Sequence, residues 1–301
     1  MSQIQLNFNE ISLLAEKFVP KLLFIYTDME INNNVIYIFY KNINNSEFIN
    51  AAKPFNPTII YDEDQKNPSV SQNLAQSRRD FDSRSLEVKV LGGDGLLNED
   101  TGSHCSVGFW AKSIALNAFS IVTAGHCYKS GEYSYYQWSS TSSSGLLIGP
   151  MIYSLNDHYD FGIISLDYDN VVPTFSIRND DDKEFKELII TGGAPVSSHN
   201  VHICKSGYTT HLTCGHVSGL NGIALRNPEG GGILYDLIIT GFVSYYGDSG
   251  GSAFSFVSPQ DLYSVFVNGI FSVIGAAIQP IDKIFKELDK RGRHYELYLG
   301  K

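Results

Sequence analysis

Three short segments, far apart in the sequence, carry residue types that could together perform nucleophilic catalysis. A serine lies in the glycine-rich segment YGDSGGS (residues 246–252), a histidine in TAGHC (123–127), and an aspartate at the start of DFGIISL (160–166). A serine hydroxyl becomes a useful nucleophile only when a base accepts its proton and a third group holds the base in the right tautomer. His126, Asp160 and Ser249 therefore form a candidate catalytic triad.

A second set of catalytic groups is compatible with part of this pattern. The segment GDSGG also matches the GxSxG turn of α/β-hydrolases, which needs an acid and then a histidine after the serine, here Asp282 or Asp289 with His294. In that fold the serine turn leads directly into a helix, and strands alternate with helices. Residues 250–256 have the pattern of a strand, so we favour the triad that uses the two upstream segments.

The elements that must position these residues are predicted to be short strands. Apolar runs bounded by Gly, Asn, Asp and Ser recur at residues 106–111, 119–123, 146–153, 162–166, 188–191, 233–242 and 263–271. This pattern predicts an all-β barrel or sandwich. Asp160 stands at the entrance of one run, where burial can shield it, whereas we interpret the competing Asp157 as a loop residue that caps a turn. Helical spacing of apolar residues over 280–293 predicts a C-terminal helix.

The first 90 residues have a different composition, rich in Asn, Asp, Glu and Lys. Residues 35–40 and 58–61 are predicted strands, and residues 47–53 a short helix. The polar stretch 62–84 has the composition of an exposed linker. The start of the chain lacks the basic and apolar parts of a signal peptide, and no segment reaches the roughly 20 apolar residues that span a membrane.

Charge and cysteine content limit the classes of partner and compartment. The chain of 301 residues has a formal net charge of −10 and no run of Lys and Arg, which argues against nucleic acid as a partner. Its four cysteines fall as two local pairs, Cys105 with Cys127 and Cys204 with Cys214, a pattern typical of disulfides in an oxidising compartment. We give the cysteines more weight than the missing signal peptide and expect a secreted monomer with no cofactor and no membrane partner.

The motifs TAGHC, DFGIISL and GDSGG, in this order and with the two cysteine pairs, resemble the chymotrypsin-like serine endopeptidases. The finer resemblance, over residues 91–301, is to the bacterial streptogrisin and α-lytic protease branch. It implies two six-stranded antiparallel β-barrels of chymotrypsin type with a C-terminal helix, preceded by a small α+β segment. Residues 91–190 would form the first barrel with His126 and Asp160, and residues 191–301 the second barrel with the serine. Residues 1–90 would be a truncated or remnant pro-region, processed near Val90–Leu91.

The resemblance also implies roles for the residues around the triad. Ser249 would attack the peptide carbonyl, and the backbone N–H groups of Gly247 and Ser249 would form the oxyanion hole. Lys205 would make a partly buried pair with Asp248 and so hold the oxyanion loop, although a lysine lacks the bidentate geometry of arginine. Disulfides would join Cys105 to Cys127 and Cys204 to Cys214.

The second cysteine pair also has neighbours that could bind a metal. His202, His211 and His216 lie close to Cys204 and Cys214 in the sequence, and zinc sites use such thiolates and imidazoles. We favour the alternative, a hairpin closed by a disulfide, and expect no metal site.

The substrate pocket is where the sequence departs from the family. Val243 and Ser244 precede GDSGG without the cysteine that relatives often carry there. Ser272 and Val273 would also belong to the pocket, in a strand that resembles the one pairing with the substrate backbone, and Val273 would make the pocket shallow. No acid lies at the expected pocket floor, so we expect a peptide or protein substrate with a small or apolar residue before the cleaved bond (P1). Two alternatives stay open: a catalytically silent binding protein on this fold, and a zymogen-like form whose own residues 1–90 occupy the cleft.

Overall fold

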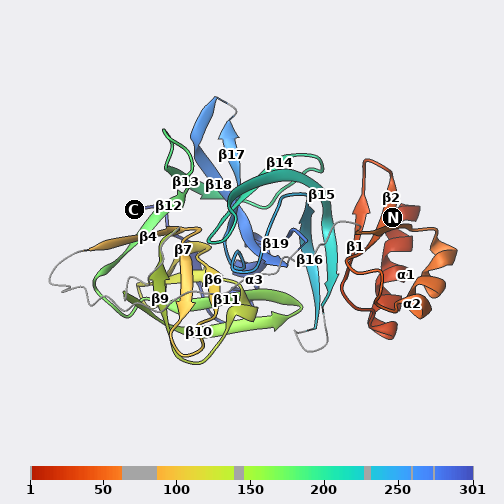
Figure 1. Ribbon diagram of the computed structural model, residues 1–301, viewed down its shortest axis with the longest axis horizontal. Coiled ribbons are helices and arrows are strands. Elements are labelled where there is room, and N and C mark those ends of the chain that lie inside the picture. Colours follow the sequence, from red (N-terminus) through yellow and green to blue (C-terminus); the bar gives the residue numbers. More distant parts are fainter. Residues whose placement is uncertain are drawn as a thin grey trace.

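Two large β-sheets and a small N-terminal unit make up the computed structural model (Figure 1). The structure describes residues 2–62, 87–138, 146–226, 232–258, 260–273 and 275–300. The predicted linker 62–84 lies outside these residues except at its first position. The mainly β architecture with a C-terminal helix and a preceding α+β segment is as the sequence predicted.

The N-terminal unit contains one helix that the sequence analysis did not identify. The unit's elements are α1 (Gln3–Phe18), β1 (Leu23–Asp28), β2 (Asn33–Ile38), α2 (Ser46–Ala52), a 3₁₀ turn η1 (Lys53–Phe55) and β3 (Thr58–Tyr61). The α1 helix begins after Ser2, whose hydroxyl caps it by accepting from the Gln5 N–H at 3.3 Å. It buries Phe8, Ile11 and Ala15, which the three- and four-residue spacing places on one face.

The N-terminal unit is joined to the rest of the protein by a continuous sheet. Strand β1 pairs antiparallel with β15 (His211–Leu225), with Leu23 opposite Leu225 and Ile25 opposite Ile223. The side chains of Ile223 and Leu225 pack in the same buried cluster as the core of the unit. In Figure 1 the unit lies at one end of the molecule, against β15 and β16 (Ile233–Thr240).

The first barrel is an eight-stranded sheet in the order β20-β7-β8-β11-β10-β9-β5-β6. Its strands are β5 (Gly95–Asn98), β6 (His104–Ser106), β7 (Phe109–Ser113), β8 (Ala118–Thr123), β9 (Glu132–Tyr136), β10 (Leu147–Asp157), β11 (Tyr159–Ser165) and β20 (Tyr295–Leu297). The predicted run 106–111 is split between β6 and β7. The sheet exceeds the six predicted strands partly because β20, at the far end of the chain, pairs with β7.

The second barrel belongs to a twelve-stranded sheet that includes the three strands of the N-terminal unit. Its other strands are β4 (Val88–Gly92), β12 (Val171–Arg178), β13 (Glu187–Gly193), β14 (His202–Gly207), β15, β16, β17 (Ser252–Ser258), β18 (Asp261–Val273) and β19 (Ala277–Pro280). Pairing is mostly antiparallel, but β2–β3, β4–β12 and β13–β18 are parallel. Strands β4 and β12 belong to this sheet by their hydrogen bonds. However, one side chain of each strand, Val90 of β4 and Val171 of β12, packs in the core of the first barrel.

The boundary that was predicted at residues 90 and 91 falls inside a strand. Val90 and Leu91 are both buried in β4, where Val90 lies opposite Pro173 of β12. The peptide bond between them is therefore not exposed in this structure.

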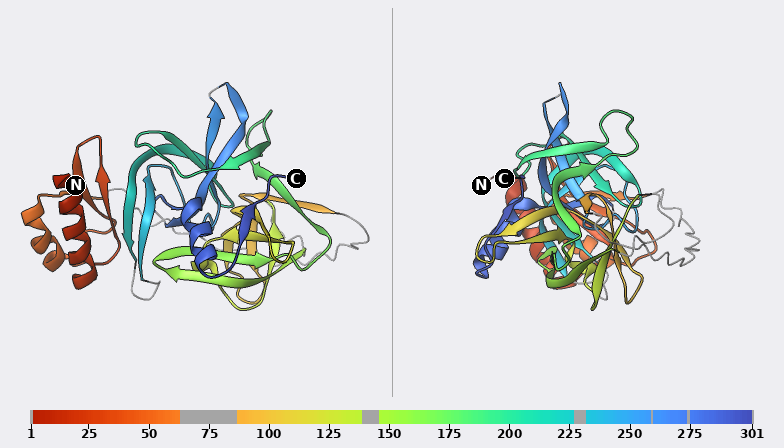
Figure 2. Two further views of the ribbon diagram at one scale, coloured as in Figure 1. Left: turned by 180° about the vertical axis from the view of Figure 1, so that it is seen from behind. Right: turned by 90° about the vertical axis from the view of Figure 1, so that its left-hand side faces the viewer.

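The C-terminal helix α3 (Ile281–Lys290) packs where the two barrels meet. Its buried residues Ile281, Ile284 and Leu288 lie in one core cluster with Phe161 of the first barrel and Val267 of the second. In the left view of Figure 2 the helix lies near the middle of the molecule, and the right view shows it at the surface. None of the described helices is long and apolar enough to span a membrane.

Candidate active site

His126 lies directly after a buried strand of the first barrel. Strand β8 ends at Thr123, and the 3₁₀ turn η2 (Gly125–Cys127) then carries the histidine toward the cleft. Gly125 is required there, because a Cβ would lie 1.8 Å from the Leu155 carbonyl oxygen. Both the backbone and the ring of His126 bind Asp160: the N–H donates to Oδ1 at 2.8 Å, and Nδ1 lies 2.6 Å from Oδ2.

Asp160 is fully buried near the start of β11. Besides His126, the Ser272 hydroxyl donates to its Oδ2 at 2.6 Å, and its own N–H donates to Gln279 Oε1 at 3.0 Å. Burial alone would raise the pKa of Asp160, but the charge and hydrogen bonding of His126, the charge of Arg226 and the Ser272 hydroxyl outweigh it, so the pKa lies below its usual range. The carboxylate therefore stays ionised at neutral pH.

The competing acid, Asp157, lies outside this network. Its side chain is 73% exposed, and His158 Nδ1 lies 3.9 Å from its carboxylate. The acid that contacts His126 is therefore Asp160, at the other side of the β10–β11 turn.

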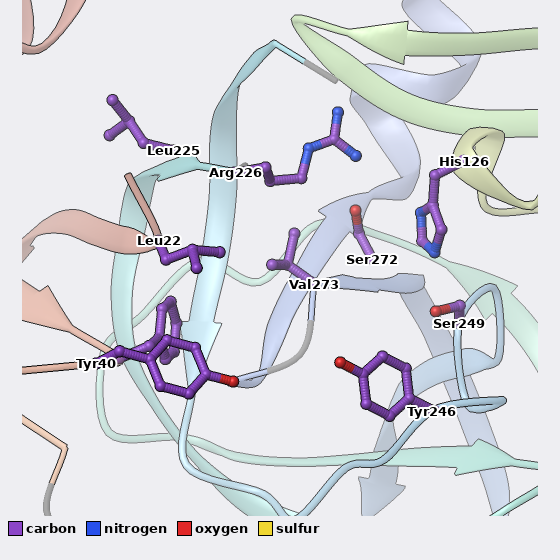
Figure 3. Close-up of a pocket in the computed structure, with 10 residues that line it drawn as sticks. Leu22, Tyr40, His126, Leu225, Arg226, Tyr246, Ser249, Ser272 and Val273 are labelled. Carbon is purple, nitrogen blue, oxygen red and sulfur yellow. The ribbon is translucent and has the colours of Figure 1, made fainter. Parts of the chain in front are cut away.

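Ser249 and His126 line the same cavity, which has a volume of about 310 Å³ (Figure 3). The serine lies in the loop between β16 and β17 and is 8% exposed. Among the described residues, Ser249 Oγ makes no hydrogen bond with the imidazole, so the two groups must approach further before a proton can pass. Such loose contacts are common in free enzymes and tighten when substrate binds.

Gly247 and Ser249, whose N–H groups were predicted to form the oxyanion hole, lie in one loop before β17. Gly247 has φ +97°, a left-handed conformation that other residues rarely adopt. Two hydrogen bonds from Ser106 anchor the carbonyls: its hydroxyl donates to Gly247 O and its N–H to Ser249 O, each at 2.7 Å. Within the described part of the chain, the N–H groups of Gly247 and Ser249 donate no hydrogen bond.

A buried ion pair supports this loop from behind. Lys205 Nζ lies 3.4 Å from Asp248 Oδ2, and both side chains are completely buried rather than partly buried as predicted. Thr210 links them: its hydroxyl accepts from Lys205 at 2.5 Å and donates to Asp248 at 2.6 Å. Asp248 also accepts from the Tyr245 N–H at 2.8 Å. Burial lowers the pKa of Lys205, and the negative charge of Asp248 opposes this shift.

The four predicted pocket residues do not line one cavity. Ser272 and Val273 line the cavity of His126 and Ser249. Val243 and Ser244 instead line a second cavity of about 400 Å³. The prediction placed these residues in one pocket because of the family resemblance, whereas the structure distributes them between two cavities.

Several residues of the first cavity were not identified from the sequence. They are Leu22, Phe39 and Tyr40 of the N-terminal unit, with Leu225, Arg226 and Tyr246. Figure 3 shows Tyr40 and Tyr246 reaching into the same space from opposite sides. No local motif marks Leu22, Phe39 and Tyr40, because the pairing of β1 with β15 brings the N-terminal unit to the cavity.

Both predicted cysteine pairs are disulfides in the structure. Cys105–Cys127 fixes the residue next to His126, and Cys204–Cys214 closes the β14–β15 hairpin next to Lys205. His202 lies near the second disulfide. Because both of its cysteines are oxidised, this cluster lacks the thiolates that a zinc site of this kind would need.

Comparisons with known proteins agree with this architecture. No family model matches the sequence. Thermobifida fusca protease A is 19% identical, with a TM-score of 0.52 over 70% of this chain and 100% of its own. Cellulomonas bogoriensis chymotrypsin is 22% identical, with a TM-score of 0.52 over 70% and 100%. A glutamic acid-specific serine protease that uses a histidine triad in substrate binding is 26% identical, with a TM-score of 0.53 over 69% and 100%.

Each comparison covers nearly all of the other protein and about 70% of this one. The two curled sheets and the C-terminal helix fit these neighbours. The chain therefore has the double-barrel fold of the bacterial chymotrypsin-like serine proteases.

Proposed function

We propose that this protein is a serine endopeptidase that works through an acyl-enzyme on Ser249. The observation that carries the proposal is the 2.6 Å contact between His126 Nδ1 and the buried Asp160, with Ser249 in the same cavity. A proton on Nδ1 satisfies the carboxylate and leaves Nε2 free as a base. An ionised acid, a neutral imidazole and a hydroxyl in this arrangement are the parts of a catalytic triad.

In the proposed reaction, Ser249 Oγ attacks the carbonyl carbon while His126 Nε2 takes the hydroxyl proton. The negative charge on the substrate oxygen is stabilised by the N–H groups of Gly247 and Ser249. The imidazolium, paired with Asp160, then gives its proton to the leaving amine as the C–N bond breaks. Water, activated by the same imidazole, hydrolyses the acyl-enzyme and restores the serine.

The properties of the cavity support a small or apolar residue at P1. Apart from Arg226, the residues that line it are aliphatic, aromatic or uncharged polar side chains and the imidazole of His126. We propose an extracellular location for the enzyme, which the two disulfides support.

A fluorophosphonate probe tests the proposed nucleophile on the full chain. The wild-type protein is expected to form a covalent adduct at Ser249, identified by peptide mass spectrometry. His126→Ala should react at least a thousandfold more slowly, because the hydroxyl loses its base. His104→Ala, outside the cavity, is the matched control and should react like the wild type. Absence of an adduct in the wild type would favour a silent binding protein on the same fold.

A second proposal concerns control of this site by the N-terminal unit. Leu22, Phe39 and Tyr40 line the cavity together with the proposed nucleophile and base. A Cβ on Gly275 would lie 2.2 Å from the Phe39 ring, so the unit fits closely against the second barrel. We infer that the unit restricts access of long peptides, as in a zymogen.

Tyr40→Ala is expected to raise kcat/KM for octapeptides by about tenfold, because a larger fraction of molecules then has an open cleft. Dipeptide esters should gain less, because they need less of the cavity. Leu13→Ala, an exposed position on α1, is the matched control. Equal rates in the wild type and Tyr40→Ala for both substrate lengths would contradict restriction by the unit.

A further inference from the structure

Arg226 introduces a positive charge into an otherwise mostly apolar cavity. It follows β15 directly, and among the described lining residues it is the one with a permanent charge. Its side chain is 11% exposed. In Figure 3 it lies beside Ser272, with the guanidinium on the side of the cavity that His126 also occupies.

The hydrogen bonds of Arg226 leave one edge of the guanidinium unused. Nη1 donates to Asn156 Oδ1 and Nη2 to Asn156 O, both at 2.7 Å. These two bonds use one hydrogen of each terminal nitrogen, Nη1 and Nη2, and fix the plane of the guanidinium. Nε is buried and has no partner among the described residues. Nε and the second hydrogen of Nη2 form the side-on fork that matches a carboxylate in a bidentate contact.

The nearby acids do not occupy this fork. Nη1 lies 3.8 Å from Asp160 Oδ2, beyond hydrogen-bond distance, and Asp160 already accepts from His126 and Ser272. Burial lowers the pKa of Arg226, and the negative charges of Asp160 and Asp157 oppose this shift. A buried donor without a partner destabilises a fold, and a ligand carboxylate in the cavity would supply the acceptor that Nε lacks.

We propose that Arg226 binds the side-chain carboxylate of the substrate residue at P2, one residue before P1. The inference rests on the proposed peptidase function. Ser249, His126, Ser272 and Arg226 line one cavity, so with the P1 carbonyl at Ser249 the proposal places the P2 side chain on the Arg226 side of this cavity. The preferred substrates are therefore peptides with Glu or Asp at P2 and a small or apolar residue at P1.

The test compares fluorogenic peptides of sequence Ala-Ala-Xaa-Leu, with Glu, Gln or Lys as Xaa, on the full chain. In the wild type, kcat/KM for Glu should exceed that for Gln by about tenfold or more, because a charged bidentate contact replaces a neutral one. Arg226→Gln should lower the Glu-to-Gln ratio to about one, whereas Arg226→Lys should keep part of it. Arg293→Gln, whose guanidinium lies 5.0 Å from the Tyr153 ring, is the matched control.

Each other outcome has a defined meaning. Fluorophosphonate labelling of Arg226→Gln at Ser249 shows that the variant is folded and keeps its nucleophile. A wild type that does not distinguish Glu from Gln, or an Arg226→Gln variant that keeps the ratio, overturns the proposal and leaves the peptidase function intact. A change in rate shared by all peptides would assign Arg226 to positioning of Asp160 alone and also overturn it. If the wild type shows neither labelling at Ser249 nor hydrolysis of any peptide, the peptidase function itself is refuted.

Discussion

Asp160→Asn is expected to lower kcat for peptide hydrolysis by about four orders of magnitude. The carboxylate accepts from both the N–H and the Nδ1 of His126. An amide that turns its NH₂ toward Nδ1 would stabilise the tautomer with the proton on Nε2, which cannot accept the serine proton. Because the substrate-binding surface is unchanged, KM should change little. Steady-state kinetics on the full chain measure both constants.

Asp157→Asn is the matched control for this variant, since Asp157 lies in the same β10–β11 hairpin but is exposed. Its kcat should stay within about twofold of the wild type, as surface substitutions away from special features have small effects. A loss of less than tenfold in Asp160→Asn would argue that Asp160 does not orient the base.

The second large effect is expected in stability rather than in catalysis. Lys205→Met should lower the free energy of unfolding by about 3–5 kcal/mol, because it leaves Asp248 as an unpaired charge in the protein interior. Both side chains of this pair are completely buried. Denaturant unfolding followed by fluorescence measures the change.

The double variant Lys205→Met with Asp248→Asn distinguishes the cost of an unpaired buried charge from the cost of altered packing. It removes the uncompensated charge, so it should recover part of the lost stability. The recovery should be incomplete because the N–H of Tyr245 loses a carboxylate acceptor. If Lys205→Met unfolds like the wild type, the pair does not stabilise the loop that carries Gly247.

The sequence predicted best those features that are local along the chain. The histidine, aspartate and serine segments each end or begin a strand, and the spacing of Ile281, Ile284 and Leu288 predicted α3. The α1 helix was missed because its apolar positions are diluted by polar residues, and the segment was considered only as a signal peptide.

Features that depend on distant pairing could not be predicted in this way. The hydrogen bonds between β1 and β15 join segments about 200 residues apart and bring Leu22 and Tyr40 to the cavity. The orientation of Arg226 likewise depends on a hydrogen bond to Asn156, which lies on another strand. Periodicity reports which face of an element is buried, but it does not report which partner buries it.

The position of α3 limits how the cleft can move. The helix buries side chains against both barrels, and β20, which follows it, hydrogen-bonds to β7 of the first barrel. Separating the barrels would therefore require breaking a packed core and a strand pairing at the same time. We therefore expect the width of the cleft between His126 and Ser249 to stay constant. A substrate would be accommodated by movements of side chains and of the N-terminal unit.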